Sequence, residues 1–194
     1  MTWYVPTATE YEPGIEEQEQ DQEVETQLNQ HEFVAFPKMA RLFREVIISE
    51  KIDGTNACIK ITEDGQFLTG SRSRWITQDD DNFGFSKWAH DRKDELMKLG
   101  VGTHFGEWWG SGIQRGYGLQ KGEKRFSLFD VARWLENDDW PAFCNVVPVL
   151  YRGLFATSEV EKSIVLLKQF GSYAAPGFLK PEGVVVFHVA ANMG

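Results

Sequence analysis

The sequence predicts an α+β fold with antiparallel sheets and a few peripheral helices. Three observations support this prediction. Short β-rich runs outnumber the helical stretches, and the two kinds do not alternate in the strict order that a parallel sheet would require. The chain has 194 residues, of which 42% are apolar and 25% are charged. This length and composition favour one domain that buries a sizeable core without disulfides or structural metals.

The β-rich runs follow one another from residue 45 onward. The first is rich in β-branched residues, the second alternates, and the second and third are joined by the hairpin signal Glu63-Asp64-Gly65. Further β-branched and aromatic runs follow, separated by glycine and proline. The expected strands are 45–49, 57–61, 67–69, 103–108, 125–131, 145–151 and 183–189.

Two segments have helical periodicity. The first covers 84–99 and is followed by Gly100, which suits the residue that ends a helix. The second covers 159–170, with Ser158 as the expected N-terminal cap and Gly171 as the stop. We therefore expect two helices, both on the outside of the sheets.

The acidity of the chain is concentrated in its first 32 residues. The net charge is −9, and residues 1–32 hold nine acidic residues and no Lys or Arg. The remaining 20 acids and 20 bases of residues 33–194 cancel. We expect residues 1–32 to form a flexible acidic tail and residues 33–194 to form the folded domain. A neutral domain can still carry a basic groove for nucleic acid.

The composition excludes several classes of protein. No apolar run approaches the roughly 18 residues of a membrane helix, and the N-terminus carries no signal-peptide pattern. Cys58 and Cys144 lie far apart and are expected to be free thiols, as in a reducing compartment. The four histidines are scattered, which argues against a zinc site. We expect a cytoplasmic location, for example in a bacterial cell or a phage-infected cell.

The segment EKIDGTN at 50–56 is the most informative for chemistry. It places Lys51 at a strand end before a turn that contains Asp53 and Gly54. A lysine that is buried or flanked by positive groups can lose its proton and act as a nucleophile. A glycine in such a turn allows a phosphate or the chain to approach closely.

Four further segments follow EKIDGTN in order. They are GSRSR at 70–74, HFGEWWG at 104–110, RFSLFDV at 125–131 and PEGVVV at 181–186. Together the five segments resemble the motifs of the covalent nucleotidyltransferases, which include DNA ligases, RNA ligases and capping enzymes. The resemblance spans residues 45–189. The E-K-x-D-G-T-N run at 50–56 and the F-G-E-x-x-G-x-G-I-Q run at 105–114 make the chain most similar to the RNA ligase 2 family within this superfamily.

The resemblance implies a nucleotidyltransferase fold similar to ATP-grasp enzymes, with two sheets flanking a nucleotide cleft. It also implies a role for each matching residue. Lys51 would attack the α-phosphate of ATP and hold AMP. Phe129 would stack on adenine, and Glu107 would accept hydrogen bonds from the ribose. The other residues expected to contact ATP or AMP are Glu50, Asp53, Gly54, Asn56, Arg72 and Glu182.

The implied partners are ATP, a divalent metal and RNA. Mg²⁺ is the expected metal, with Mn²⁺ as an alternative, and Glu182 is its candidate ligand. Arg74 and Arg115 are candidate contacts to nucleic acid, and the glycine-rich loop around Arg115 is either a mobile connection or a surface that closes on the substrate. The expected substrate is an RNA end or a nicked RNA duplex, handled by a monomer.

One motif of the family has no counterpart here. The family carries a K-x-K sequence, its motif V, after the glutamate that Glu182 matches, whereas the last lysine of this chain is Lys180. We expect a chain that stops short of motif V, with a natural minimal or degenerate member as the alternative. Two other functions stay open: a DNA ligase or capping-type enzyme, and a catalytically impaired module that binds nucleotide or RNA ends.

Overall fold

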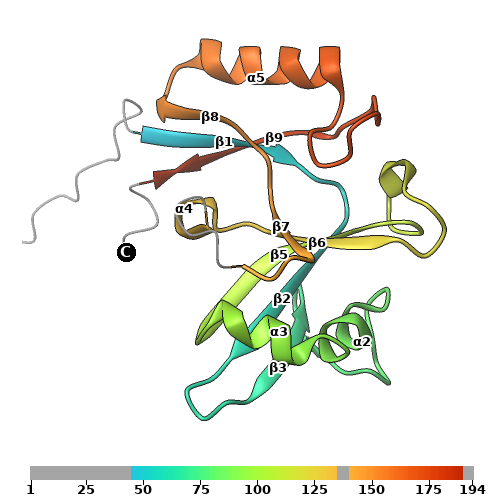
Figure 1. Ribbon diagram of the computed structural model, residues 1–194. Helices are drawn as coiled ribbons and strands as arrows, with labels where there is room; N and C mark the ends of the chain where they lie inside the picture. The colour runs from blue at the N-terminus through green and yellow to red at the C-terminus, as the bar shows by residue number, and fades with distance from the viewer. Residues whose placement is uncertain (1–44, 135–139, 190–194) are drawn as a thin grey trace, which may run out of the picture. The chain divides into compact units, whose positions relative to one another are not determined.

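The computed structural model describes residues 45–134 and 140–189 (Figure 1). These residues belong to the second of two units in the chain, residues 40–194. The acidic tail expected at 1–32 lies outside the described residues, so its boundary stays a prediction.

The smaller of two sheets has the order β8-β1-β9. Its central strand β1 (Glu45–Lys51) pairs antiparallel with β8 (Val149–Leu154) and with β9 (Gly183–His188). The long helix α5 (Thr157–Phe170) packs against this sheet (Figure 1). The helix covers one face, and the other face is left to form one wall of a cleft.

The larger sheet has six strands in the order β4-β3-β2-β5-β6-β7. Its antiparallel strands are β2 (Thr55–Ile61), β3 (Phe67–Ser71), β4 (Trp75–Ile76), β5 (Gly102–Gly110) and β6 (Lys124–Leu128). At one edge, β7 (Cys144–Val146) runs parallel to β6. The short helices α2 (Phe85–His90) and α3 (Lys93–Leu96) lie on one side of this sheet (Figure 1).

The main core lies between the larger sheet and these helices. Ring centroids of Phe85 lie 5.4 Å from Trp108 and 5.1 Å from Phe126, and Trp88 lies 4.9 Å from Trp108. The period of two along β2 sends Ala57, Ile59 and Ile61 into this core and leaves the alternate residues on the opposite face. That opposite face forms the second wall of the cleft.

A smaller core joins the two sheets. Ile47 on β1 and Ile52 after it pack with Trp109, Val131 and Val147. Because the chain passes directly from β1 to β2 through residues 52–54, this core holds the two sheets together beside the cleft.

The predicted α+β class with two sheets is confirmed, and each expected strand region contains a strand. Cys58 and Cys144 are buried free thiols, as expected. Within the described part of the chain, no helix has the length and apolar character needed to cross a membrane.

Four element predictions were wrong in detail. The helix expected over 84–99 is divided into α2, α3 and the 3-10 turn η1 (Met97–Leu99), since Arg92 leaves the helical region with φ −125° and ψ 18°. The strand expected over 125–131 ends at Leu128. The Oδ1 atom of Asp130 then accepts the Arg133 N–H and starts helix α4 (Val131–Trp134).

The third detail concerns the segment 145–151, which contributes to two strands in different sheets. Pro148 separates them, and its carbonyl accepts the Glu50 N–H at 2.8 Å.

Helix α5 begins two residues earlier than expected. Its N-terminal cap is Ala156 and has no side-chain hydrogen bond, so Ser158 is not the cap. Gly171, with φ 79°, ends it as predicted.

Truncating a ring in the main core tests this arrangement. We expect Phe85→Ala to lower the free energy of unfolding by about 3–5 kcal/mol, because Phe85 is fully buried among three aromatic rings. The control Phe170→Ala removes an exposed ring and should change it by no more than about 0.5 kcal/mol. Urea unfolding followed by circular dichroism measures both, and equal losses would contradict the placement of the core.

Candidate active site

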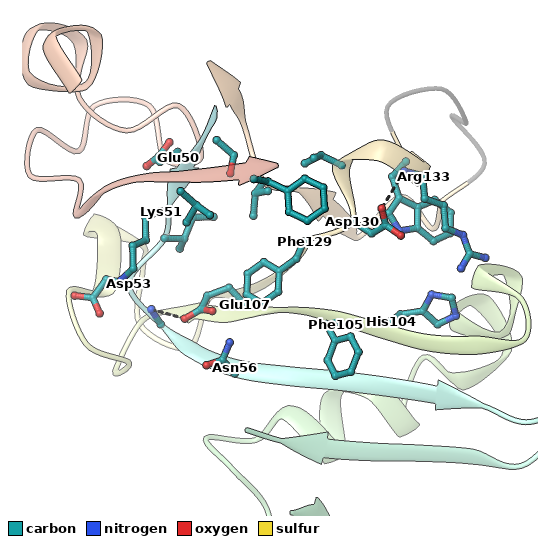
Figure 2. Close-up of a pocket in the computed structure, with 18 of the residues that line it drawn as sticks. Glu50, Lys51, Asp53, Asn56, His104, Phe105, Glu107, Phe129, Asp130 and Arg133 are labelled. Carbon is teal, nitrogen blue, oxygen red and sulfur yellow. Dashed lines mark hydrogen bonds between the residues drawn. The ribbon is translucent and has the colours of Figure 1, made fainter. Parts of the chain in front are cut away.

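A cleft of about 670 Å³ opens between the two sheets (Figure 2). Its walls come from the end of β1, from β5, from the link between β6 and α4, and from β9. This volume lies within the range of pockets that bind small molecules. The cleft collects most of the residues that the sequence analysis selected.

Lys51 reaches the cleft because of the alternation along β1. Ser49 and Lys51 point to the cleft face, where Val185 stands opposite Ser49 on β9. The Lys51 side chain is 49% exposed, and its Nζ forms an ion pair with Oε1 of Glu182. The candidate nucleophile and the candidate metal ligand are therefore in direct contact.

Glu50 must point to the other face of the same sheet. Its carboxylate is 1% exposed and accepts hydrogen bonds from Ser172 Oγ at 2.5 Å, Tyr173 N at 2.8 Å and Ala174 N at 3.0 Å. The residue borders the cleft, but its carboxylate fixes the loop between α5 and β9 (Figure 2). The structure thus does not bring this carboxylate to the expected nucleotide site.

Three side chains form hydrogen bonds with the turn at Asp53 and Gly54. The Oδ2 atom of Asp53 accepts from Nε of Arg115 at 2.7 Å, and the Asp53 N–H donates to the Tyr117 hydroxyl at 2.7 Å. The Gly54 N–H donates to Oε1 of Glu107 at 2.9 Å. A Cβ at Gly54 would lie 2.5 Å from the Trp108 carbonyl, so only glycine fits there.

Arg115 was expected to contact nucleic acid, and its guanidinium has other partners in this structure. Besides Asp53, it donates from Nη1 to the carbonyl of Lys180 at 3.1 Å. It therefore links the turn after β1 to the segment that leads to Glu182. Its predicted contact with nucleic acid stays a prediction.

Tyr117 supports the turn beside the cleft, a position that its sequence context beside Arg115 did not predict. It is buried, it has the left-handed φ of 51°, and its ring packs 5.0 Å from Trp109 and 4.7 Å from Phe178. Burial raises the pKa of its hydroxyl to about 12. The four glycines between 110 and 118 were the available signal, because such a loop can fold back tightly on its neighbours.

Glu107 and Asn56 form the floor of the cleft. They stand opposite each other on β5 and β2, so both side chains lie on the cleft face (Figure 2). Burial raises the pKa of the Glu107 carboxyl to about 7, although the Gly54 N–H and the charge of Lys51 favour its ionised form. Near neutral pH this carboxyl can both accept and donate hydrogen bonds.

Aromatic side chains line the middle of the cleft. Phe129 follows β6, and its N–H donates to the carbonyl of Phe105 at 2.9 Å, which sets the two residues side by side. Both rings are partly exposed in the cleft (Figure 2). Val185 and Phe187 face them from β9. Of these four residues, the sequence analysis selected only Phe129.

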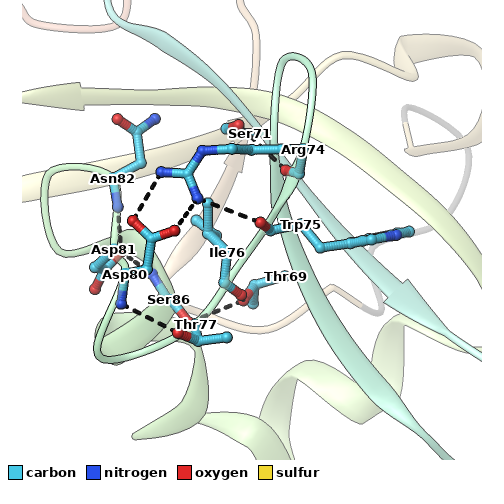
Figure 3. Close-up of polar contacts among 10 residues, drawn as sticks. All are labelled: Thr69, Ser71, Arg74, Trp75, Ile76, Thr77, Asp80, Asp81, Asn82 and Ser86. Carbon is cyan, nitrogen blue, oxygen red and sulfur yellow. Dashed lines mark hydrogen bonds and ion pairs between the residues drawn. The ribbon is translucent and has the colours of Figure 1, made fainter.

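The two arginines between β3 and β4 are not part of the cleft wall. Arg72 comes one residue after the last β2–β3 pair, Ala57 with Ser71, and so lies next to Asn56 at the edge of the floor. Arg74 forms an ion pair with Asp80 through two contacts (Figure 3). The predicted contacts of both arginines with substrate stay predictions.

Glu182 has one carboxylate oxygen left for a ligand. Its Oε1 pairs with Lys51, and its Oε2 is buried without a hydrogen-bond partner. The described residues contain no cluster of three or more metal-ligating side chains. Mg²⁺ is usually held by one or two carboxylates together with waters and substrate phosphates. A single free carboxylate oxygen fits this kind of site.

Comparisons with known proteins show the family to which the chain belongs. The model of the RNA ligase family matches residues 44–191, so the chain belongs to the RNA ligase family. No curated protein matches the chain.

Solved RNA ligases share its fold. Two forms of an archaeal ATP-dependent RNA ligase are 19% identical to it, with TM-scores of 0.52 and 0.51 over 79% and 78% of this chain. The matches cover 45% and 44% of those ligases. A variant of the Naegleria gruberi RNA ligase solved with AMP and Mn is 15% identical, with a TM-score of 0.48, and the match covers 82% of this chain and 57% of that one. The chain spans about half the length of these ligases.

Replacing Glu50 tests its structural role. In Glu50→Gln one acceptor oxygen becomes a donor that faces donors on Ser172, Tyr173 or Ala174. We expect the free energy of unfolding to fall by about 1–3 kcal/mol. The control Glu45→Gln, at an exposed ion pair with Arg152, should lose at most about 1 kcal/mol. If urea unfolding gives the same stability for Glu50→Gln and the wild type, the anchoring role is wrong.

The raised pKa of Glu107 makes stability depend on pH. The folded chain keeps the Glu107 proton up to about pH 7, whereas the unfolded chain releases it near the ordinary glutamate pKa of 4.5. The folded form binds more protons in this window, so its stability falls as pH rises through it.

The variant Glu107→Gln removes this titration. Between pH 4.5 and 8, the unfolding free energy of the wild type should fall by about 1–2 kcal/mol relative to that of the variant. This fall is smaller than the full pKa shift would give, because solvent at the cleft screens part of the interaction. Urea unfolding at a series of pH values measures the difference. A difference that stays flat would contradict the burial of this carboxyl.

Proposed function

We propose that this chain is the nucleotidyltransferase part of an ATP-dependent RNA ligase. The observation that carries the proposal is the position of Lys51. It extends into the cleft from the end of β1, pairs with Glu182 and faces the floor that holds Glu107. Membership of the RNA ligase family supports the same reaction class.

The first step would be the transfer of AMP to Lys51. Its uncharged amine attacks the α-phosphorus of ATP, a P–N bond forms, the bond to the bridging oxygen breaks, and pyrophosphate leaves. The ammonium of Lys51 must first release a proton, and the contacting carboxylate of Glu182 is placed to accept it. The product would be a lysine phosphoramidate of AMP.

The rest of the cleft fits a nucleotide. The partly exposed ring of Phe129, with Val185 and Phe187 opposite, provides apolar surfaces for adenine. Glu107 and Asn56 on the floor provide polar groups for the ribose. A divalent metal, Mg²⁺ or Mn²⁺, held by the free oxygen of Glu182 would neutralise phosphate charge. That a variant of the Naegleria gruberi ligase was solved with AMP and Mn is compatible with this assignment.

In the later steps, AMP would pass from Lys51 to the 5′-phosphate of an RNA end. A 3′-hydroxyl would then attack that phosphate, form the phosphodiester and release AMP. A DNA ligase or a capping-type enzyme would share the first step, and comparing RNA with DNA ends and ATP with GTP separates these functions.

Intact mass spectrometry tests the first step. After incubation with ATP and Mg²⁺, the chain should gain the mass of one AMP moiety, and Lys51→Ala should gain none. The matched control Lys60→Ala removes a lysine outside the cleft wall and should gain AMP like the wild type. If the wild type gains no mass, or Lys51→Ala still does, the proposal fails, and a module that only binds nucleotide or RNA ends becomes the better description.

A further inference from the structure

The floor of the cleft continues past Asn56 and Glu107 as an open face of the larger sheet. One row of directly paired residues crosses four strands there: Trp75 pairs with Gly70, Gly70 with Cys58, and Cys58 with Phe105. Paired residues share a face, and Cys58 lies two positions after Asn56 on β2. The whole row therefore lies on the same face as the floor of the cleft.

Large apolar side chains stand exposed on this face. Trp75 is 55% exposed and Phe105 is 60% exposed, and Leu68 on β3 is also exposed. The six-membered ring of Trp75 lies beside Gly70, where an added Cβ would be 3.2 Å from its Cε3 atom and 2.7 Å from the Cys58 sulfur. The indole thus covers Cys58 and leaves the rest of its surface to solvent.

This exposure contrasts with the other side of the same sheet. There the rings of Phe85, Trp88 and Trp108 are packed into the main core. Exposed apolar residues that form a contiguous patch often mark a surface that binds a partner. Sheet faces that carry exposed aromatic residues bind single-stranded nucleic acid in several folds, since every base can stack on a ring.

The charges around the row suit a polyanion. Lys60 lies on the same face, opposite Leu68, and Arg72 follows the end of β3 next to Asn56. Within residues 45–134 and 140–189, neither takes part in an ion pair. Two acids of the segment that follows β4 are already engaged. Asp80 pairs with Arg74, and Asp81 accepts N–H groups at the start of α2 (Figure 3).

We propose that this face binds unpaired nucleotides of an RNA end. We call it the stacking surface and define it as Lys60, Leu68, Arg72, Trp75 and Phe105. Bases would stack on Trp75 and Phe105, and phosphates would contact Lys60 and Arg72. The inference rests on the proposed function, because the bound end would lie beside Lys51. It also selects a substrate class, since bases inside a continuous duplex hide the faces that stacking requires.

The dimensions allow more than one nucleotide. The backbones at Trp75 and Phe105 stand three strand spacings apart, which corresponds to about 14 Å, and the indole extends from β4 over Gly70. The row lies two residues along the strands from Asn56 and Glu107, about 7 Å from the floor of the cleft. The two rings can therefore serve separate bases of one strand that leads to the reactive end.

Binding of a short oligonucleotide tests the stacking surface. The probe is a 5′-phosphorylated RNA of about 12 nucleotides, within the size range of single-strand sites, used as a single strand and as a blunt duplex. Fluorescence anisotropy with the full chain at fixed salt gives each Kd. We expect tighter binding of the single strand. Trp75→Ala should weaken it about tenfold, Trp75→Phe should retain most of it, and Phe170→Ala on α5 should leave it unchanged.

Two results would overturn the inference: equal single-strand affinity in Trp75→Ala and the wild type, or equal loss on the single strand and the duplex. A second measurement avoids dependence on the folding of the variant. A 5-iodouridine RNA irradiated with the wild-type chain should crosslink to Trp75 or Phe105. Crosslinks confined to other parts of the chain would also contradict the proposal.

RNA binding by the stacking surface can be measured separately from the transfer of AMP to Lys51. Trp75 is outside the wall of the cleft, so Trp75→Ala should still gain AMP from ATP wherever the wild type does. Loss of RNA affinity with intact AMP transfer supports the stacking surface. A wild type that binds the single strand through Trp75 but gains no AMP would remove the proposed function and leave the stacking surface in place.

Discussion

The alternation of side chains at the end of β1 is the constraint on which the site depends. Two consecutive residues, Glu50 and Lys51, must point to opposite faces of the smaller sheet. Lys51 enters the cleft and meets Glu182, whereas Glu50 binds three donors in the loop at 172–174. That loop leads from α5 towards β9, the strand that Glu182 precedes. One strand end therefore positions the lysine directly and helps to position its partner through the opposite face.

The turn that follows β1 makes the second connection. Asp53 is held by Arg115 and by the Tyr117 hydroxyl, and Gly54 donates its N–H to Glu107. The chain crosses from the smaller to the larger sheet at this turn. Fixing the turn thus fixes the distance between the wall that carries Lys51 and the floor that carries Glu107. This arrangement explains why a lysine and several carboxyl groups gather in one cleft.

Much of the fold and part of the site could be predicted from the sequence. The ordered motifs predicted both sheets and a site shared by Lys51, Glu107 and Glu182. This prediction was possible because each motif lies on a strand or at its end. The direction of Glu50 follows from strand alternation, but its partners in the loop at 172–174 depend on packing more than 120 residues away. The ion pair of Arg115 with Asp53 likewise joins residues 62 positions apart. Such contacts leave no local pattern, and neither does the exposure of an aromatic ring on one face of a sheet.

A crystal structure of the chain after incubation with ATP and Mg²⁺ would show whether Lys51 receives AMP in this cleft. We expect continuous density from Nζ of Lys51 to a phosphorus atom. The base would lie between Phe129 and β9, the ribose would face Glu107, and the ion pair between Lys51 and Glu182 would be broken. A nucleotide bound outside this cleft, or one bound inside it with that ion pair intact and Glu107 turned away, would contradict the account.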